Sequence, residues 1–230
     1  MSYLITPSLY SEVAWYQFLE GKTKKDMLDT LNKVEIEPNE AMIKGRQFED
    51  DIYDCTQGKP TPDGEYGRCV AEIADTVYGG NWQETVSSWI TVNGIDFLLY
   101  GRTDVIKRDW IYDIKFGKNY DIGKYQYSIQ HDLYMYCTGL QKFAYLISNG
   151  KEVWREDYFW YDSTEAYFRS ALMDMTEFIF SDDEFRDAYI ANWKTKTSRE
   201  QDSGPKVGPP LTWNDLADEY DKGNQGRPAR

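Results

Sequence analysis

The sequence changes from helical to extended patterning near residue 80, and this change limits the chain to folds that join helices to a sheet. Before that point, apolar residues recur at helical spacing in four segments separated by Gly, Pro or charged residues. The predicted helices cover residues 7–21, 24–33, 39–56 and 66–78. After it, β-prone runs flank Asn93-Gly94, a strong signal for a β-hairpin turn. The pattern is typical of a mixed α+β fold, with a central mixed and mostly antiparallel sheet flanked by helices.

The extended part of the chain contains further strands and helices in alternation. Its first four predicted strands follow one another closely enough to form an antiparallel meander. They cover residues 82–92, 95–100, 102–107 and 110–116. The later elements are a helix over 121–139, strands over 142–148 and 153–161, and helices over 164–180 and 184–193. We therefore predict one domain over residues 1–195, with a helical N-terminal part, and a polar, flexible tail over 196–230.

Nothing in the sequence indicates export or membrane insertion. The N-terminus lacks the basic-then-apolar pattern of a signal peptide, and no apolar run approaches the ~20 residues needed to cross a bilayer. Cys55, Cys69 and Cys137 are odd in number and form no C-x-x-C motif. Ordinary buried thiols are therefore expected, rather than disulfides or zinc and iron–sulfur ligands. These features predict a soluble, cytoplasmic protein.

The stretch Tyr112-Asp113-Ile114-Lys115 carries the strongest chemical signal. On a strand, residues two apart point to the same side, so Asp113 and Lys115 would face a common cavity while Ile114 turns into the core. A carboxylate beside an ammonium suits metal-assisted phosphodiester hydrolysis. The carboxylate holds the ion, and the lysine orients or deprotonates the attacking water or stabilises charge at the phosphorus. An exposed strand face would give the same three residues, so the interpretation depends on their neighbours.

Asp104 lies on the strand that precedes Asp113 in the sequence. Neighbouring strands are ~4.8 Å apart, so the two carboxylates can share one ion. Magnesium favours octahedral ligation by oxygen, to which the main-chain carbonyl of Ile114 is a further possible contributor. The alternative is a surface strand residue, although Asp is disfavoured within a β-prone run.

The third predicted carboxylate ligand is Glu49, on the predicted helix over 39–56. At helical spacing Glu49 falls inside the apolar stripe that includes Met42, Phe48 and Ile52. Carboxylates in such positions are rare unless they are paired or bound to metal. The alternative is a salt-bridged glutamate at the edge of the stripe. We predict that Glu49, Asp104 and Asp113 together hold Mg²⁺ or Mn²⁺.

Gln130 and Tyr134 are one turn apart on the predicted helix over 121–139. On an inward face, an amide and a phenol can hydrogen-bond a phosphate, a ligated water or a catalytic carboxylate. Plain core packing is equally compatible with this segment. His131, the only histidine, falls ~100° from Gln130 around the helix and is interpreted as a flank residue rather than a ligand.

Four motifs occur in order over roughly residues 40–170. They are Gly45-x-x-x-Glu49, Gly101-x-x-Asp104, Asp113-Ile114-Lys115-Phe116-Gly117-Lys118 and Gln130-x-x-x-Tyr134. Their order resembles the RecB-like exonuclease branch of the PD-(D/E)xK nuclease superfamily. The resemblance implies a restriction-endonuclease-like core in which Asp104 and Asp113 bind metal and Lys115 is the catalytic lysine. It implies that Gln130 and Tyr134 support the site and that Glu49 takes the helical ligand position, where many members carry histidine.

The predicted function is hydrolysis of DNA phosphodiester bonds in recombination, repair or processing, with exonuclease action favoured over endonuclease action. The candidate phosphate contacts, for which solvated surface charge is the alternative, are Arg46, Arg102, Lys118 and Lys124. The tyrosines that could stack unpaired bases, if they do not pack in the core, are Tyr120, Tyr125 and Tyr127. The net charge of −13 opposes DNA binding, but a bound cation reverses the local sign at a carboxylate cluster.

Other functions are compatible with the same residues. One is a catalytically inactive nuclease-fold module that binds DNA or a protein partner. Another, compatible with nuclease activity, is a component of a recombination complex whose tail recruits a single-strand-binding or annealing protein. The apolar residues available to such a docking segment are Leu211, Trp213, Leu216 and Tyr220. A third is a soluble α+β domain with a structural role.

Overall fold

The first 80 residues are mostly helical in the computed structural model, which describes residues 2–18 and 21–195. A short strand, β1 (Ser2–Ile5), precedes the helices α1 (Pro7–Phe18), α2 (Lys24–Leu31), α3 (Glu40–Thr56) and α4 (Gly64–Val77). These are the four predicted helices. Local sequence explains where two of them begin. Thr23 forms a capping box with Asp26 before α2, and the Asn39 side chain accepts a hydrogen bond from the Met42 amide at the start of α3.

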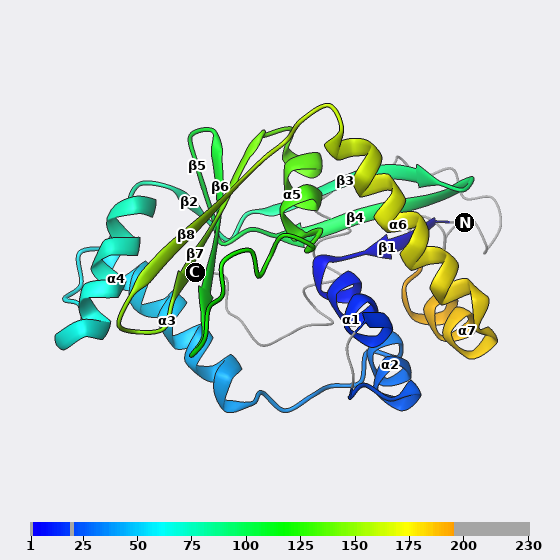
Figure 1. Ribbon diagram of the computed structural model, residues 1–230, viewed down its shortest axis with the longest axis horizontal. Coiled ribbons are helices and arrows are strands. Elements are labelled where there is room, and N and C mark those ends of the chain that lie inside the picture. The colour runs from blue at the N-terminus through cyan, green and yellow to red at the C-terminus, as the bar shows by residue number, and fades with distance from the viewer. Residues whose placement is uncertain (1, 19–20, 196–230) are drawn as a thin grey trace, which may run out of the picture. The chain divides into compact units, whose positions relative to one another are not determined.

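Groups of strands and helices follow to the end of the described chain (Figure 1). The strands are β2 (Asn81–Trp82), β3 (Thr85–Val92), β4 (Ile95–Arg102), β5 (Val105–Lys107), β6 (Trp110–Phe116), β7 (Lys142–Ser148) and β8 (Val153–Phe159). The helices are α5 (Gln130–Thr138), α6 (Thr164–Ser181) and α7 (Asp183–Asn192). The predicted α+β class is confirmed. In the described part of the chain, every helix is too short or too polar to span a lipid bilayer. The three cysteines are free thiols.

The chain divides into two compact units, each assembled from separate segments. Of the described residues, the first contains those up to Val34, the segment Ser87–Gly101 and those from Arg169 to Thr195. The second contains Glu35–Val86 and Arg102–Phe168. All six predicted catalytic residues belong to the second unit. The tail predicted over residues 196–230, with its candidate docking segment, lies outside the described residues.

The first unit contains a three-stranded sheet in the order β1-β4-β3. β1 pairs in parallel with β4, and Leu4 lies opposite Leu98 in that register. β3 and β4 are joined through Asn93 and Gly94, whose φ angles of 50° and 76° are those of the predicted hairpin turn. Leu4 also donates a backbone hydrogen bond of 2.7 Å to the carbonyl of Trp193, so this sheet and the end of α7 are tied together.

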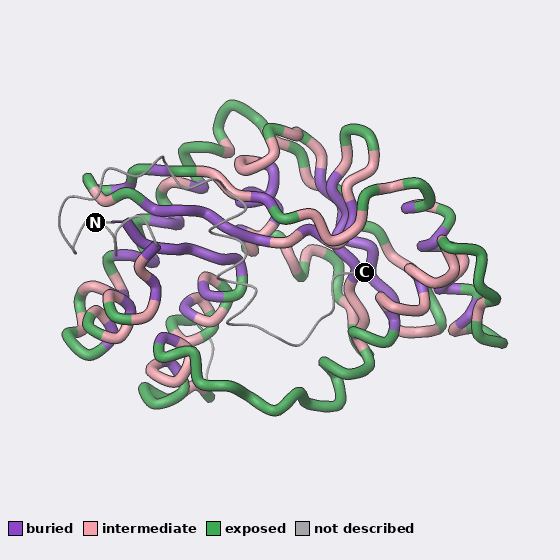
Figure 2. The backbone as a smooth tube through the Cα atoms, turned by 180° about the vertical axis from the view of Figure 1, so that it is seen from behind, coloured by how far each residue is buried: buried purple, intermediate pink, exposed green. Residues whose placement is uncertain are grey.

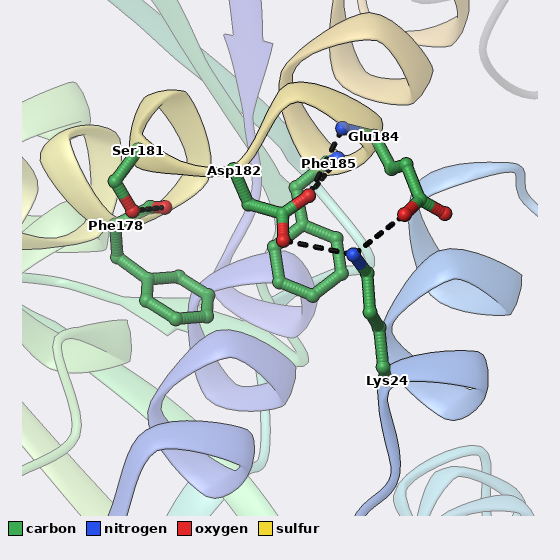
Figure 3. A network of polar contacts seen from close by, with 6 residues as sticks. All are labelled: Lys24, Phe178, Ser181, Asp182, Glu184 and Phe185. Carbon is green, nitrogen blue, oxygen red and sulfur yellow. Dashed lines mark hydrogen bonds and ion pairs between the residues drawn. The ribbon is translucent and has the colours of Figure 1, made fainter.

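A polar network in the first unit joins the start of α2 to the start of α7 (Figure 3). Lys24 Nζ lies 2.9 Å from Asp182 Oδ2 and 2.7 Å from Glu184 Oε1. Asp182 also caps α7, because its other oxygen accepts hydrogen bonds from the amides of Glu184 and Phe185. The Asp182 carboxylate therefore caps the start of α7 and is linked to the start of α2 through its ion pair with Lys24.

The second unit contains a five-stranded sheet in the order β2-β5-β6-β7-β8. β6 and β7 are parallel, whereas the other neighbouring strands are antiparallel. Parallel neighbours need a crossover, and α5 supplies it between β6 and β7. The sheet is therefore mixed and mostly antiparallel, as predicted.

Helices cover both faces of the five-stranded sheet. One face packs against α3 and α4 in a core cluster that includes Phe48, Ile73 and Ile114. Residues of β6 that alternate with Ile114 face the other side, where α5 packs through His131 and Tyr134 against Phe143 of β7. Buried residues are concentrated in the strands of each unit (Figure 2). The site residues on β6 therefore lie on the face covered by α5.

The predicted meander over residues 82–116 is wrong, because its strands belong to two different sheets. The first predicted strand is interrupted between Trp82 and Thr85, where Gln83 has a φ of 55°. Instead, the Gln83 amide donates a hydrogen bond to the Asp104 carbonyl, and the Thr103 amide donates one to the Glu84 carbonyl. These two hydrogen bonds extend the pairing of β2 with β5. The break at Gln83 sends β3 and β4 to the first unit and leaves β5 and β6 in the second.

The predicted helix over 121–139 is also too long, since α5 begins at Gln130. Residues 121–128 form successive turns, with amide-to-carbonyl hydrogen bonds from Lys124 to Asp121, from Gln126 to Gly123 and from Ser128 to Tyr125. Gly123 has a φ of 82°, which is incompatible with a right-handed helix.

Candidate active site

Asp113 and Lys115 lie side by side on the face of β6 that is covered by α5. Lys115 Nζ is 2.5 Å from Asp113 Oδ2, and Gln130 Nε2 donates a hydrogen bond of 2.7 Å to Asp113 Oδ1. Asp113 is only 2% exposed. Oδ1 therefore has a hydrogen-bond partner, whereas Oδ2 is buried with Lys115 as an ion-pair partner and no hydrogen bond.

Asp104 lies just before β5, opposite Asp113. The last pair of the β5–β6 ladder is Val105 with Tyr112, and one further step would pair Asp104 with Asp113. The ladder ends there instead, and Asp104 Oδ2 accepts a hydrogen bond of 2.7 Å from the Ile114 amide. The carboxylate thus takes the place of the backbone acceptor that a longer β5 would offer to β6.

The electrostatics of the site are those of crowded acidic groups around one cation. Burial raises the pKa of Asp104 well above its usual range, and the nearby charges of Asp113 and Glu49 raise it further. Burial also raises the pKa of Asp113, against the opposing effect of Lys115. For Lys115 itself, burial lowers the pKa, but the carboxylates of Asp113 and Asp104 outweigh it and the net pKa is raised. Lys115 is therefore a cation in this arrangement.

Glu49 approaches this group from α3. It is half-buried and close enough to Asp104 for its charge to raise the pKa of that carboxyl. The apolar stripe predicted around it is only partly right. Phe48 and Ile52 are fully buried, but Met42 is 51% exposed, because the first turns of α3 extend beyond the core.

The donor set suits a hard divalent cation in its chemistry. Carboxylate oxygens are the ligands that Mg²⁺ prefers, and a cation would relieve the repulsion that raises the pKa of Asp104. The side chains as they stand are not grouped as a coordination shell, and no set of three Asp, Glu, His or Cys residues is so grouped within residues 2–18 and 21–195. Lys115 and Gln130 each contact one Asp113 oxygen, and an ionised carboxylate has further lone pairs that a cation could use.

α5 supplies two polar side chains to the site face. Gln130 holds Asp113, and the Tyr134 hydroxyl donates a hydrogen bond of 2.7 Å to the carbonyl of Arg102, in the segment that leads to Asp104. The interpretation of His131 as a flank residue is wrong. His131 is 5% exposed and its ring stacks on that of Tyr158 at 4.0 Å, because α5 is buried against the sheet over more than one face.

The four candidate phosphate contacts all belong to the second unit. Arg46 on α3 is exposed, and so are Lys118 and Lys124 in the segment between β6 and α5. Arg102 is half-buried at the end of β4. Lys118 is near enough to Glu40 to contribute to the lowered pKa of that carboxyl, after the larger effect of Lys44.

Sequence reasoning missed a row of side chains that crosses three strands. In the register of the sheet, Asp113 lies opposite Tyr145 of β7, and Tyr145 lies opposite Glu156 of β8. Tyr145 is fully buried, with Lys115 Nζ 5.9 Å from the centre of its ring. No local pattern marks these positions, since the row exists only once β6, β7 and β8 are paired.

Asp132 on α5 is a second buried carboxyl, 3% exposed, that the sequence did not single out. Burial raises its pKa from 3.8 to about 7, and burial lowers the pKa of the adjacent His131 to about 4. Because the pKa of Asp132 is higher in the folded protein, the folded state loses stability as the pH rises from about 4 to about 7.

We expect Asp132→Asn to stabilise the protein more at pH 8 than at pH 5, by about 2 kcal/mol, because the amide cannot acquire the buried charge. Urea unfolding at the two pH values measures the difference. The same substitution at the exposed Asp121 is the control and should show no such pH dependence. Equal effects of Asp132→Asn at both pH values would contradict the assignment of a raised pKa.

Comparison with known proteins shows a likeness of fold. The sequence matches no protein-family profile and no curated protein sequence. The crystal structure of SSO0001 resembles this chain with a TM-score of 0.51 and 12% identity, covering 76% of each chain. Crystal structures of LHK-Exo in complex with dAMP and of the alkaline exonuclease LHK-Exo from Laribacter hongkongensis give TM-scores of 0.42 and 0.43, with 13% and 14% identity. Both comparisons cover 86% of this chain and 93% of the other. The chain shares its fold with SSO0001.

Proposed function

We propose that this chain is a divalent-metal-dependent deoxyribonuclease of the PD-(D/E)xK superfamily, in its RecB-like branch, and that it acts as an exonuclease in DNA recombination, repair or processing. The observation that carries the proposal is the meeting of two carboxylates and one ammonium at β6. Asp104 stands across from Asp113, and Lys115 Nζ lies 2.5 Å from Asp113. Metal-assisted phosphodiester hydrolysis uses this combination of anionic groups for a metal ion and a cation for the phosphate.

The residues that would hold the ion are Glu49, Asp104 and Asp113, with the Ile114 carbonyl as a further oxygen donor. A bound Mg²⁺ or Mn²⁺ supplies Lewis-acid activation of water and of the phosphate oxygens. Gln130 fixes the rotation of the Asp113 carboxylate through its hydrogen bond to Oδ1. Tyr134 holds the backbone at Arg102, two residues before Asp104, and so steadies the second carboxylate.

Lys115 is the group that would act on the phosphate directly. Its ammonium is held in the protonated state by Asp113 and Asp104, so it carries a positive charge at the place where negative charge develops during attack on phosphorus. It would also donate a hydrogen bond to orient the attacking water. The exposed cations Arg46, Lys118 and Lys124, together with Arg102, would contact the flanking phosphates.

The direct test compares cleavage of two substrates, an end-labelled linear duplex DNA and a closed circular duplex DNA. We expect the purified chain to shorten linear DNA from its ends in the presence of Mg²⁺ or Mn²⁺, to leave closed circles intact and to be inactive in EDTA. Nicking of closed circles would show endonuclease action instead. If DNA is cleaved neither with Mg²⁺ nor with Mn²⁺, the proposal is overturned.

A second candidate function is a nuclease-fold module that binds DNA or a protein without cleaving DNA. The direct contact between Lys115 and Asp113 favours it, because in this arrangement both groups are engaged with each other. The net charge of −13 is also compatible with a protein partner. The two functions separate in the same assay, since the module would retain labelled DNA or the partner without producing shortened strands.

We also propose that residues 196–230 recruit a single-strand-binding or annealing protein. The support is the sequence alone, in which Leu211, Trp213, Leu216 and Tyr220 stand within a polar stretch rich in Gly and Pro. Deleting residues 200–230 should abolish co-purification of such a partner while leaving cleavage of naked DNA unchanged. Retained co-purification would contradict the proposal.

A further inference from the structure

The segment between β6 and α5, residues 117–129, runs beside the proposed active site and is held mainly by short-range turns. It leaves β6 directly after Phe116, where the Gly117 amide bonds to the carbonyl of Ser148 at the end of β7. Three turn hydrogen bonds organise its second half. Contacts with the sheet add to these turns, through the rings of Tyr120 on Trp154 and Tyr125 on Tyr145 and through one carboxylate.

Glu156 on β8 supplies that carboxylate and is the polar tether of the segment. One carboxylate oxygen accepts hydrogen bonds from the Tyr120 hydroxyl and, at 2.6 Å, from the Gly123 amide. The other oxygen accepts a hydrogen bond of 2.9 Å from the Tyr158 hydroxyl. Glu156 stands two strands from Asp113 in the row through Tyr145, so the segment is fixed to the same sheet positions as the site.

The tethered segment presents aromatic and cationic side chains in close order. Tyr125 stacks on Tyr145, with ring centres 4.4 Å apart, and Lys124 Nζ lies 5.7 Å from the centre of the Tyr125 ring. Tyr127 is 75% exposed, and so it does not pack in the core. Tyr167 of α6 is 50% exposed, and its pKa is raised by burial, by Asp132 and, least, by the Tyr127 phenol, which is therefore nearby.

We propose that residues 117–129 bind unpaired nucleotides next to the reaction centre, with Tyr127 stacking on a base, and that Glu156 is the positioning residue that holds this segment in place. An exposed aromatic ring in a segment that also carries lysines suits the binding of single strands, because every unstacked base offers a π-face and every linkage a phosphate. Bases within a duplex are already stacked, so the segment selects unpaired strands. Binding of unpaired nucleotides by this segment does not depend on the proposed function. Only the statement that the bound strand leads to the reaction centre rests on it.

The first experiment measures binding of a fluorescein-labelled oligothymidylate by anisotropy in EDTA, where no cleavage can occur. Tyr127→Ala should weaken this binding roughly tenfold and leave the affinity for a blunt duplex unchanged. Tyr78→Ala, which removes a tyrosine of similar exposure at the end of α4, should leave both affinities as in the wild type. Equal loss for both variants, or none for Tyr127→Ala, would overturn the assignment of Tyr127.

The second experiment tests Glu156 with a matched neighbour. Glu156→Gln should speed hydrogen–deuterium exchange in peptides from residues 117–129 and weaken oligothymidylate binding in the same direction as Tyr127→Ala. The matched control is Asp157→Asn, which makes the same charge change at an exposed residue paired with Arg155. Unchanged exchange in Glu156→Gln would overturn the tether.

The effects of Tyr127→Ala and Glu156→Gln on oligothymidylate affinity should not be additive, because both residues act on the same bound strand. If the wild-type protein cleaves DNA, the variant Glu156→Gln should have a KM for a single-stranded substrate that is roughly tenfold higher, with little change in kcat. A wild-type protein that binds the oligothymidylate through Tyr127 but never cleaves DNA would refute the proposed function and leave this inference standing.

Discussion

Replacing Lys115 with alanine is expected to lower metal-dependent DNA cleavage by about 10²–10⁴-fold, the range found when a charge-stabilising or proton-handling group is removed from an active site. The structure gives the physical reason. Lys115 is the ammonium nearest to the two carboxylates, and those carboxylates keep it protonated. The measurement is the initial rate of release of labelled nucleotides at saturating Mg²⁺.

Loss of activity in this variant has to be separated from loss of structure, since Lys115→Ala leaves the buried Asp113 without its counter-ion. The double variant Asp113→Asn/Lys115→Met removes both charges, should give wild-type circular dichroism and should be equally inactive. Lys151→Ala removes an exposed lysine from the same unit and should retain full activity. A folded Lys115→Ala protein with wild-type cleavage would end the catalytic assignment.

Asp104→Asn should change activity and stability in opposite directions. The amide can still accept the hydrogen bond from the Ile114 amide, but it no longer repels Asp113 and Glu49. In EDTA we expect the variant to be more stable than the wild type by about 1 kcal/mol, as is common when a strained functional group is removed. Cleavage should fall by a factor of about 10²–10⁴, as for Lys115→Ala.

The metal dependence of stability completes this test. Excess Mg²⁺ should stabilise the wild type against thermal unfolding, by about 1.4 kcal/mol at a concentration tenfold above its Kd, and should have no such effect on Asp104→Asn. Asp109→Asn changes an exposed carboxylate that is paired with Lys142, and it should respond to Mg²⁺ as the wild type does. An equal rise in Tm for Asp104→Asn and the wild type would remove Asp104 from the set of proposed ligands.

Those parts of the fold that depend on short-range patterns could be predicted from the sequence. The four N-terminal helices follow from apolar spacing and from caps such as Asn39, and the placement of Asp113 and Lys115 on one face follows from strand alternation. The division of the strands between two sheets could not be predicted, because it depends on the positive φ of Gln83, a residue that carries no turn signal.

The same distinction applies to the candidate site. The contact between Gln130 and Asp113 could be predicted, since the sequence patterns put both residues on inward faces. Glu156 could not, because its role depends on the register of β7 with β8 and on hydrogen bonds to a segment more than 30 residues earlier in the chain. His131 was misplaced for a related reason, since helical periodicity does not show how many faces of a short helix the fold will cover.

The segmented layout of the two units has a consequence for anyone who wishes to dissect this protein. The chain passes from one unit to the other at residues 34–35, 86–87, 101–102 and 168–169. A fragment that begins at Glu35 and ends at Phe168 would retain every proposed catalytic side chain, yet it would also carry Ser87–Gly101 without β1, the strand that pairs with β4. Isolating the second unit therefore calls for excising that internal hairpin and rejoining Val86 to Arg102 with a short linker, rather than for simple truncation.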